Sequence, residues 1–327
     1  MFEVDFKYID ELYKLKTSNF EKVYESVDYH KLHDIFDSMY NIRDWDFSFD
    51  MSCTDLINSL FEKYVTPSTL IIASLRDHPS VREALNNCSQ EMVMDYDQET
   101  TVGGVIFLDD SWFNIRVLID RLENLKYDNI LFISYGTLVC NGEVRDNKYF
   151  QRLFQLCDKY CDNVIKVLDD CQGSLWIERD YSLFDYVLWT AHATIDSFDT
   201  GILLSAPNMP ALGAHDVGEE FLYANYKRLL ENECFCKSWN KYLSLATNFH
   251  LSQAPHIFSV PLTKDYPESY FSDLHKGKKR GMTKAPLKID ANRFIRLRVE
   301  RFLTYESKYL LLRGLRDIYY EREFVAV

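Results

Sequence analysis

The chain has 327 residues, and 47% of them are hydrophobic and 15% aromatic, so it can bury a sizeable core and wholesale disorder is excluded. The formal net charge of −13 disfavours general binding to a nucleic-acid backbone, although one local basic pocket for a small anion stays compatible with it. No uninterrupted apolar span approaches the ~20 residues that cross a bilayer, so neither nucleic acid nor membrane is expected as a partner.

The first residues and the cysteines indicate a reducing compartment. The opening MFEVDFKYIDELYK is amphipathic and carries acidic residues, which is not the pattern of a secretory signal. The eight cysteines show neither the spacing of a disulfide framework nor that of a zinc site. We therefore expect reduced cysteines, no bound metal and a cytoplasmic location.

The first 210 residues divide into a helical segment and a regular alternation of elements. Residues 1–50 are expected to be helical because apolar residues recur at three- and four-residue spacing. Helices are then expected in SCTDLINSLFEKYV, HPSVREAL, WFNIRVLIDRLENL and about 147–160, and strands in TLIIASL, GGVIFLD, NILFISY, NVIKVLD, YVLWT and GILLS. Strands that are apolar throughout and alternate with helices predict a mostly parallel sheet covered on both faces.

The pattern changes after about residue 210. A long helical stretch is expected over roughly 215–247, followed by strands that include HIFSVPL and RFIRLRV, and then an amphipathic helix at about 305–319. The sequence therefore predicts three parts: an N-terminal helical segment at 1–50, a large domain at 51–210, and a smaller C-terminal α+β domain at 211–327.

Ligands of parallel α/β sheets bind outside the carboxyl ends of the strands, so the residues that follow each strand are the candidates for a site. These residues are Arg76–Asp77–His78, Tyr135, Asp169–Asp170–Cys171–Gln172 and Thr190–Ala191–His192.

Four short segments at these strand ends together resemble one family. SCTDLIN, RDHPSV, VIKVLDDCQGS and WTAHATIDSFDTGILLS follow one another in the order and spacing of pyridoxal-phosphate (PLP) enzymes of the aspartate aminotransferase fold, also called fold type I. The resemblance is to the class V branch, which includes the cysteine desulfurases. It implies a mainly parallel seven-stranded sheet, a PLP cofactor, and a homodimer whose site lies close to the subunit interface.

The resemblance assigns the cofactor's phosphate to the start of a helix. Ser52, Cys53 and Thr54 match the family's small hydroxyl-bearing residues there, and free backbone N–H groups and the helix dipole favour a dianion at such a position. Thr190 and His192 match the two other phosphate contacts. Each of these residues also fits a plainer role, such as an ordinary helix cap at Ser52 or Thr54.

The remaining matches concern the cofactor ring and the substrate. His78 matches the histidine that stacks on the pyridine ring, where a flat aromatic face buries the ring. Asp169 matches the carboxylate that pairs with the protonated pyridine nitrogen and so makes the ring an electron sink. Gln172 matches the donor to the phenolic oxygen. Arg296, in RLRV, matches the arginine that clamps the substrate's α-carboxylate.

One position departs from the family pattern. In Ser/Thr–x–His–Lys the lysine carries the cofactor as a Schiff base and then moves the substrate's α-proton, but Ala193 stands at that position and can do neither. Three explanations stay open: a deliberate replacement of lysine by alanine, a natural lysine-free enzyme, and a fold retained only for binding. The family's glycine-rich loop is also replaced, here by TIDSFDT.

The resemblance therefore implies a PLP-dependent transferase or lyase of amino-acid metabolism that acts on an amino acid or other small-molecule amine. Aminotransfer, elimination and β- or γ-replacement all stay open. Cysteine desulfuration is disfavoured because Cys234 and Cys236 lie in a helix-like stretch, whereas that activity needs a cysteine on a mobile loop. The alternative is a natural lysine-free protein that acts as a binding or partner-stabilising subunit.

Overall fold

The structure is a computed structural model in two compact units. The larger unit comprises Tyr29–Leu138 and Val144–Asn225, and the other comprises Met1–Asp28, Val139–Glu143 and Tyr226–Val327. The residues described are 37, 39–92, 104–108, 112–138, 142–174, 176–190, 201–213, 215–216, 253–254, 257–262, 287–289 and 292–298. The domain boundaries expected after residues 50 and 210 stay predictions.

The larger unit is built on one sheet with the strand order β3-β2-β4-β5-β6-β7-β1-β8. Its strands are β1 (Asp46–Asp50), β2 (Thr69–Ser74), β3 (Gly104–Leu108), β4 (Asn129–Tyr135), β5 (Val164–Asp169), β6 (Tyr186–Thr190), β7 (Gly201–Ser205) and β8 (His215–Asp216). The pairs from β3 to β6 are parallel, whereas β7 runs antiparallel to both β6 and β1. The expected mainly parallel seven-stranded sheet is confirmed, and the two-residue β8 extends it beside β1.

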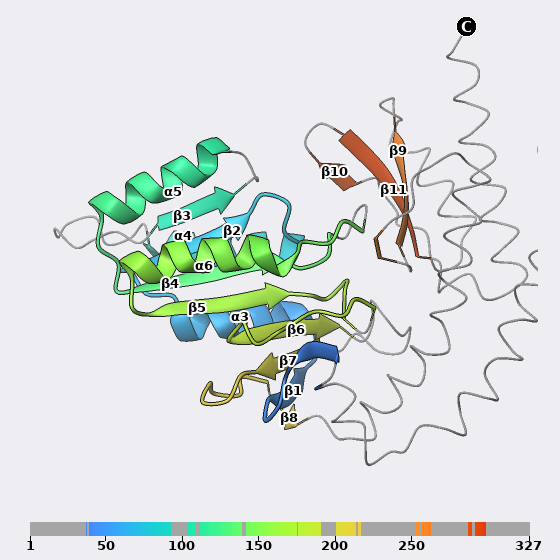
Figure 1. The fold of residues 1–327 in the computed structure, drawn as a ribbon. Coiled ribbons are helices and arrows are strands. Elements are labelled where there is room, and N and C mark those ends of the chain that lie inside the picture. The colour runs from blue at the N-terminus through green and yellow to red at the C-terminus, as the bar shows by residue number, and fades with distance from the viewer. Residues whose placement is uncertain are drawn as a thin grey trace, which may run out of the picture. The chain divides into compact units, whose positions relative to one another are not determined.

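Helices cover both faces of this sheet (Figure 1). The described helices are α3 (Cys53–Tyr64), α4 (Pro79–Met92), α5 (Trp112–Asn124) and α6 (Asn147–Tyr160). On one face, α3 and α4 share a buried cluster with β2, β4 and β5 that includes Leu56, Ile71 and Val167. On the opposite face, Phe150 and Phe154 of α6 pack edge-on against Phe132 of β4.

Burial on both faces explains why these strands are apolar without alternation. Every residue of β2 is buried, and so are all but the first residue of β4. A strand covered by helices on both sides has no solvent-facing residues to alternate with, which is the usual pattern of parallel sheets. The helices and strands expected between residues 51 and 205 are confirmed in type and approximate bounds.

Strand β1 corrects one expectation. Residues 1–50 were expected to be helical, but Asp46–Asp50 form a strand that pairs with β7 on one side and β8 on the other. DFSFD alternates polar and aromatic residues, which suits a strand. The strand is stabilised by backbone partners more than 150 residues away, which no local pattern reveals. Likewise, His215–Asp216 form β8, although a helix was expected to begin there.

The other unit contains a three-stranded antiparallel sheet of order β10-β11-β9. Its strands are β9 (Ile257–Leu262), β10 (Leu287–Ile289) and β11 (Asn292–Arg298), which confirm the strands expected in HIFSVPL and RFIRLRV. The helices expected over most of 215–247 and at about 305–319 lie outside the described residues.

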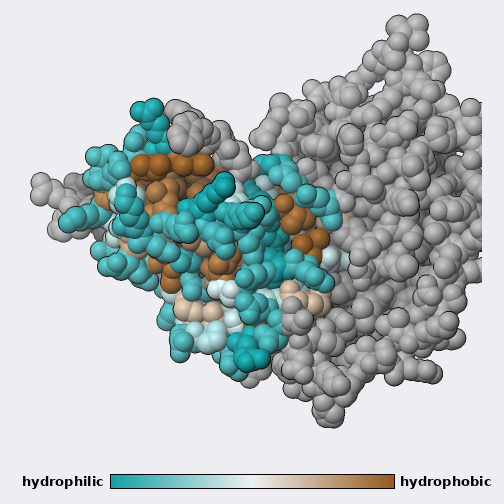
Figure 2. All heavy atoms as spheres, viewed as in Figure 1, coloured by the Kyte–Doolittle hydropathy of each residue, from teal (hydrophilic) through white to brown (hydrophobic). Residues whose placement is uncertain are grey.

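The surface of the larger unit is mostly hydrophilic on the face that Figure 2 shows, with separate apolar areas between. Few large apolar side chains among the described residues are well exposed, and the most exposed is Met51 at 80%. Within the described part of the chain, no helix combines the length and the apolar character needed to cross a bilayer.

Candidate functional site

The first turn of α3 presents free donors at one end of the sheet. Ser52 caps the helix, and its hydroxyl accepts a hydrogen bond from the Asp55 backbone N–H at 3.2 Å and donates one to the Asp55 carboxylate at 2.7 Å. The backbone N–H groups of Cys53 and Thr54 come before the first intrahelical bond, so the helix supplies them no acceptor. Their position and the helix dipole favour an anion there.

This helix start lies against the end of β6 and the beginning of β7. The Cys53 thiol donates to the Trp189 carbonyl at 2.8 Å, and Thr190 pairs with Gly201 across the strands. A Cβ atom on Gly201 would lie 2.5 Å from the Cys53 backbone nitrogen, so only glycine admits this approach. The hydroxyl-bearing residues Thr54 and Thr190 therefore belong to neighbouring segments.

The carboxylate of Asp169 ends β5 on the same face of the sheet. Ile165, Val167 and Cys171 belong to the cluster buried beneath α3 and α4, and strand alternation places Asp169 on that side as well. Asp169 is only 6% exposed and accepts a hydrogen bond from the Cys171 backbone N–H at 3.2 Å. The Cys171 thiol lies 3.2 Å from the Cys53 thiol, which links this loop to the start of α3.

Asp77 joins the carboxyl ends of β2 and β4. Its carboxylate accepts from the Ser74 N–H at 2.6 Å and from the Tyr135 N–H at 3.0 Å. Burial raises the pKa of Asp77 to about 7, although these two bonds and the Arg145 guanidinium oppose the rise, and the nearby Asp169 carboxylate adds to it. The site therefore holds two buried acids close to each other.

His78 follows directly and comes just before α4. Its side chain is exposed, and its ring Nδ1 contacts the Ser80 hydroxyl. The ring lies at the carboxyl end of β2, and its expected stacking role stays a prediction.

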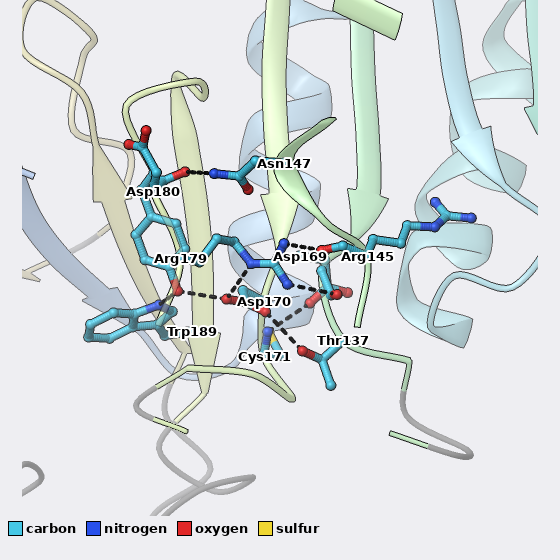
Figure 3. Close-up of polar contacts among 11 residues, drawn as sticks. Thr137, Arg145, Asn147, Asp169, Asp170, Cys171, Arg179, Asp180 and Trp189 are labelled. Carbon is cyan, nitrogen blue, oxygen red and sulfur yellow. Dashed lines mark hydrogen bonds and ion pairs between the residues drawn. The ribbon is translucent and has the colours of Figure 1, made fainter. Parts of the chain in front are cut away.

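A second network, made of buried polar side chains, surrounds Asp170, the residue after Asp169 (Figure 3). Asp170 is fully buried, 3.5 Å from Arg179 Nε, and it accepts hydrogen bonds from the Tyr181 hydroxyl at 2.6 Å and the Thr137 hydroxyl at 3.4 Å. Burial raises the pKa of Asp170, and Arg179 and Tyr181 oppose the rise. Tyr181 in turn accepts from the Trp189 indole N–H at 3.1 Å.

Arg179 fixes the backbone that follows β4. Its guanidinium donates to the carbonyls of Gly136, at 2.9 Å, and Arg145. Arg145 itself donates to the Ser134 hydroxyl at 2.6 Å and lies over the Tyr135 ring at 3.9 Å. The network therefore holds the loops after β4 and β5 together behind Asp169.

Sequence reasoning missed this supporting network. The sequence feature that could have revealed it is the pair Asp169–Asp170 at the end of a buried strand, because two adjacent buried acids need a cation or hydrogen-bond donors nearby. Arg179 and Tyr181 supply them from a loop nine to eleven residues further on.

The structure brings together only part of the expected site. Five of the expected residues are gathered on one edge, namely Ser52, Cys53, Thr54, Asp169 and Thr190, and Gln172 lies half-buried in the loop after β5. His192 and Ala193 lie outside the described residues. Arg296 lies in β11, opposite Ser259, in the other unit.

Comparison with known proteins identifies the class of fold. The chain matches a NifS-like protein with a TM-score of 0.60 at 14% identity, over 91% of this chain and 88% of that one. It matches a NifS-like protein from Rickettsia africae with a TM-score of 0.55 at 14% identity, over 96% and 89%. It also matches a lysine-to-alanine variant of serine palmitoyltransferase from S. paucimobilis with a bound PLP–myriocin aldimine, with a TM-score of 0.57 at 12% identity, over 90% and 77%.

These likenesses confirm the expected fold. The mainly parallel sheet with its smaller accompanying unit is the architecture of these proteins, and the likeness extends over about nine-tenths of the chain. No family model matches the sequence, and no curated protein matches it either.

Proposed function

We propose that this chain is a PLP-dependent enzyme, a transferase or lyase, that acts on an amino acid or other small-molecule amine. The observation that carries the proposal is the meeting of three segments on one face of the sheet: the start of α3, the end of β6 and the loop after β5. Contacts of Cys53 with Trp189 and with Cys171 join them. The similar serine palmitoyltransferase structure, which holds PLP, supports the same assignment.

The start of α3 fits the cofactor's phosphate. The N–H groups of Cys53 and Thr54 and the hydroxyls of Ser52, Thr54 and Thr190 are the donors that a phosphate dianion accepts at a helix start. His192, two residues after Thr190, would add a further donor. The net acidity of the chain does not oppose this, because the site is local and neutral donors dominate it.

Asp169 fits the ring of the cofactor. When bound, PLP supplies an electron sink for the charge that develops at the substrate's α-carbon. A buried carboxylate at the end of β5 would hold a proton on the pyridine nitrogen and keep that nitrogen charged. Gln172 would donate to the phenolic oxygen, and the exposed ring of His78 would cover one face.

The finer parts of the proposal rest on the resemblance. Arg296 would orient the substrate's carboxylate through two parallel hydrogen bonds. The protein would be a cytoplasmic homodimer of the class V branch, with a role in amino-acid biosynthesis. Which bond at the α-carbon breaks depends on residues that the resemblance does not fix.

Ala193 limits which steps of PLP chemistry the chain can perform with its own side chains. Without a lysine, the protein has no amine at this position to hold the cofactor covalently or to move the α-proton. We infer either that alanine has replaced a lysine or that the protein takes up a cofactor already joined to an amine. The similar serine palmitoyltransferase structure is itself a lysine-to-alanine variant with a bound PLP–myriocin aldimine.

Ala193 also favours a second candidate function. A natural protein with alanine at position 193 could be a binding or partner-stabilising subunit that performs no chemistry. The buried Asp169 weighs against this reading, because a buried carboxylate without a ligand to pair with is costly.

The test is the affinity for PLP of the protein and of Asp169→Asn. Loss of a charge-assisted hydrogen bond worth about 1.5–3 kcal/mol should weaken binding by roughly 10- to 150-fold, measured by the change in visible absorption or by calorimetry. Asp162→Asn is the matched control, because Asp162 is exposed at the opposite end of β5. Equal affinities for the protein and both variants would remove Asp169 from the site.

A further inference from the structure

Two cysteine thiols meet beside the candidate site. Cys53 is the first residue of α3 and Cys171 lies in the loop after β5, and their Sγ atoms are 3.2 Å apart although 118 positions separate them in the sequence. We propose that Cys53 and Cys171 form an oxidant-sensitive pair that closes to a disulfide and covalently ties the start of α3 to the loop that follows Asp169. This goes beyond the proposed function and does not depend on it.

The geometry suits closure. Both cysteines are free thiols, and each lies at the end of a buried element, so the two sulfur atoms are held near each other by the fold. Bond formation needs the sulfur atoms to approach from 3.2 Å to about 2.05 Å. The Cys53 thiol donates to the Trp189 carbonyl and the Cys171 thiol donates to Cys53, so the sulfur of Cys53 already faces its partner.

The different exposure of the two thiols sets which of them reacts first. Cys53 is half-buried and Cys171 is buried, so a reagent meets Cys53 first. The contact with Cys53, together with burial and the nearby Asp169, holds the pKa of Cys171 well above its usual value, so Cys171 is a poor nucleophile towards an outside reagent. Its position 3.2 Å from the Cys53 sulfur favours its attack on a disulfide already formed there.

The step balances with a small disulfide as oxidant. Cys53 sulfur attacks 4,4′-dithiodipyridine, forms a mixed disulfide and releases one thiopyridone. Cys171 sulfur then attacks the Cys53 sulfur and releases the second thiopyridone. Two thiols are oxidised, one reagent disulfide is reduced, and the two thiol protons leave on the two thiopyridones.

Two other described cysteines, Cys157 and Cys161, have different surroundings. The Cys161 sulfur contacts the backbone carbonyls of Tyr127, Asp128 and Asn163, and Cys157 is fully buried within α6. The short contact between the Cys53 and Cys171 sulfur atoms therefore makes a disulfide between these two residues the expected product.

The experiment uses the full chain, reduced and then treated with one equivalent of 4,4′-dithiodipyridine. We expect close to two equivalents of thiopyridone per equivalent of reagent, and a non-reducing peptide map in which the peptides containing residues 53 and 171 are linked. The linked chain should also unfold at a temperature roughly 5–10 °C higher, because the cross-link closes a long loop in the unfolded chain.

Controls separate the pair from other thiols. Cys53→Ser and Cys171→Ser should each abolish the linked peptide, whereas Cys88→Ser should leave it unchanged. Release of a single equivalent of thiopyridone, with the pyridyl group retained on Cys53 and no linked peptide in the unmodified chain, would overturn the proposal. Because the map needs no cofactor, a failure to bind PLP would leave this result unaffected.

Discussion

At the scale of single residues, three neighbouring acids have three different environments. Asp77 is held by backbone N–H groups, Asp170 by an arginine and two hydroxyls, and Asp169 by the backbone N–H and the thiol of Cys171 at the edge of the candidate site. Two of these carboxylates are committed to the fold, and Asp169 keeps acceptor capacity for a ligand. This division is the physical reason to assign the ligand to Asp169.

The raised pKa of Asp77 predicts that the stability of the fold depends on pH. Its pKa is about 7 in the folded protein, above the value of 3.8 for a free aspartate, so the folded state binds the proton more tightly. The resulting stability is fully present below pH 3.8 and is lost as the pH rises through about 7.

The measurement is urea unfolding of the protein and of Asp77→Asn at about pH 5 and about pH 8. The free energy of unfolding of the protein relative to the variant should fall by about 2–3 kcal/mol between these pH values. A difference that stays constant, or that grows with pH, would show that Asp77 is charged throughout.

Replacing Tyr181 tests how much the buried network around Asp170 contributes to the free energy of unfolding. Tyr181→Phe removes the donor to Asp170 and the acceptor of the Trp189 indole, and leaves both groups buried with one partner fewer. The free energy of unfolding should fall by about 1–3 kcal/mol in a urea titration. Tyr160→Phe is the control, since its hydroxyl donates to Glu123 at the surface, and it should cost less than ~1 kcal/mol. Equal losses would mean that the buried network adds no stability.

At the scale of elements, the approach of β7 to α3 positions the first turn of α3, which is proposed to bind the cofactor's phosphate. Gly201→Ala would place a methyl group 2.5 Å from the Cys53 nitrogen and from the Ser52 carbonyl carbon, both backbone atoms that cannot move alone. We expect a loss of about 1–3 kcal/mol of stability and weaker binding of PLP, measured by urea unfolding and by titration.

Gly104→Ala is the matched control for this prediction. Its methyl group would meet Arg121 Nη1 at 2.5 Å, the far end of an exposed side chain that can turn away. If both variants unfold alike and bind PLP alike, the close approach at Gly201 has no role in positioning α3.

Local signals explain which elements the sequence could predict. Continuous apolar runs predicted β2 and β4, because burial acts on neighbouring residues. Ser52 and Thr54 were both candidates for the cap of α3, and Ser52 is the residue that caps it. Strand β1 could not be predicted in this way, since its partners β7 and β8 lie far along the chain.

At the scale of the whole molecule, the sheet edge that holds the candidate site was predictable, and the network that supports it was not. The rule that ligands bind at the carboxyl ends of parallel strands pointed to Asp77, Asp169 and Thr190, and these residues lie at that edge. The buried pairing of Asp170 with Arg179 depends on how a loop returns over the sheet, which composition and spacing do not encode.

The central claim is that this edge of the sheet is a PLP site with an alanine where a lysine would act. The most direct measurement compares the visible spectra of the protein and of Ala193→Lys, each mixed with PLP, before and after borohydride reduction. We predict a new band in the variant alone and a reduced, covalently bound cofactor that peptide mapping places at position 193. If neither protein changes the cofactor's spectrum or retains it through gel filtration, the chain shares the fold of the PLP enzymes and not their site.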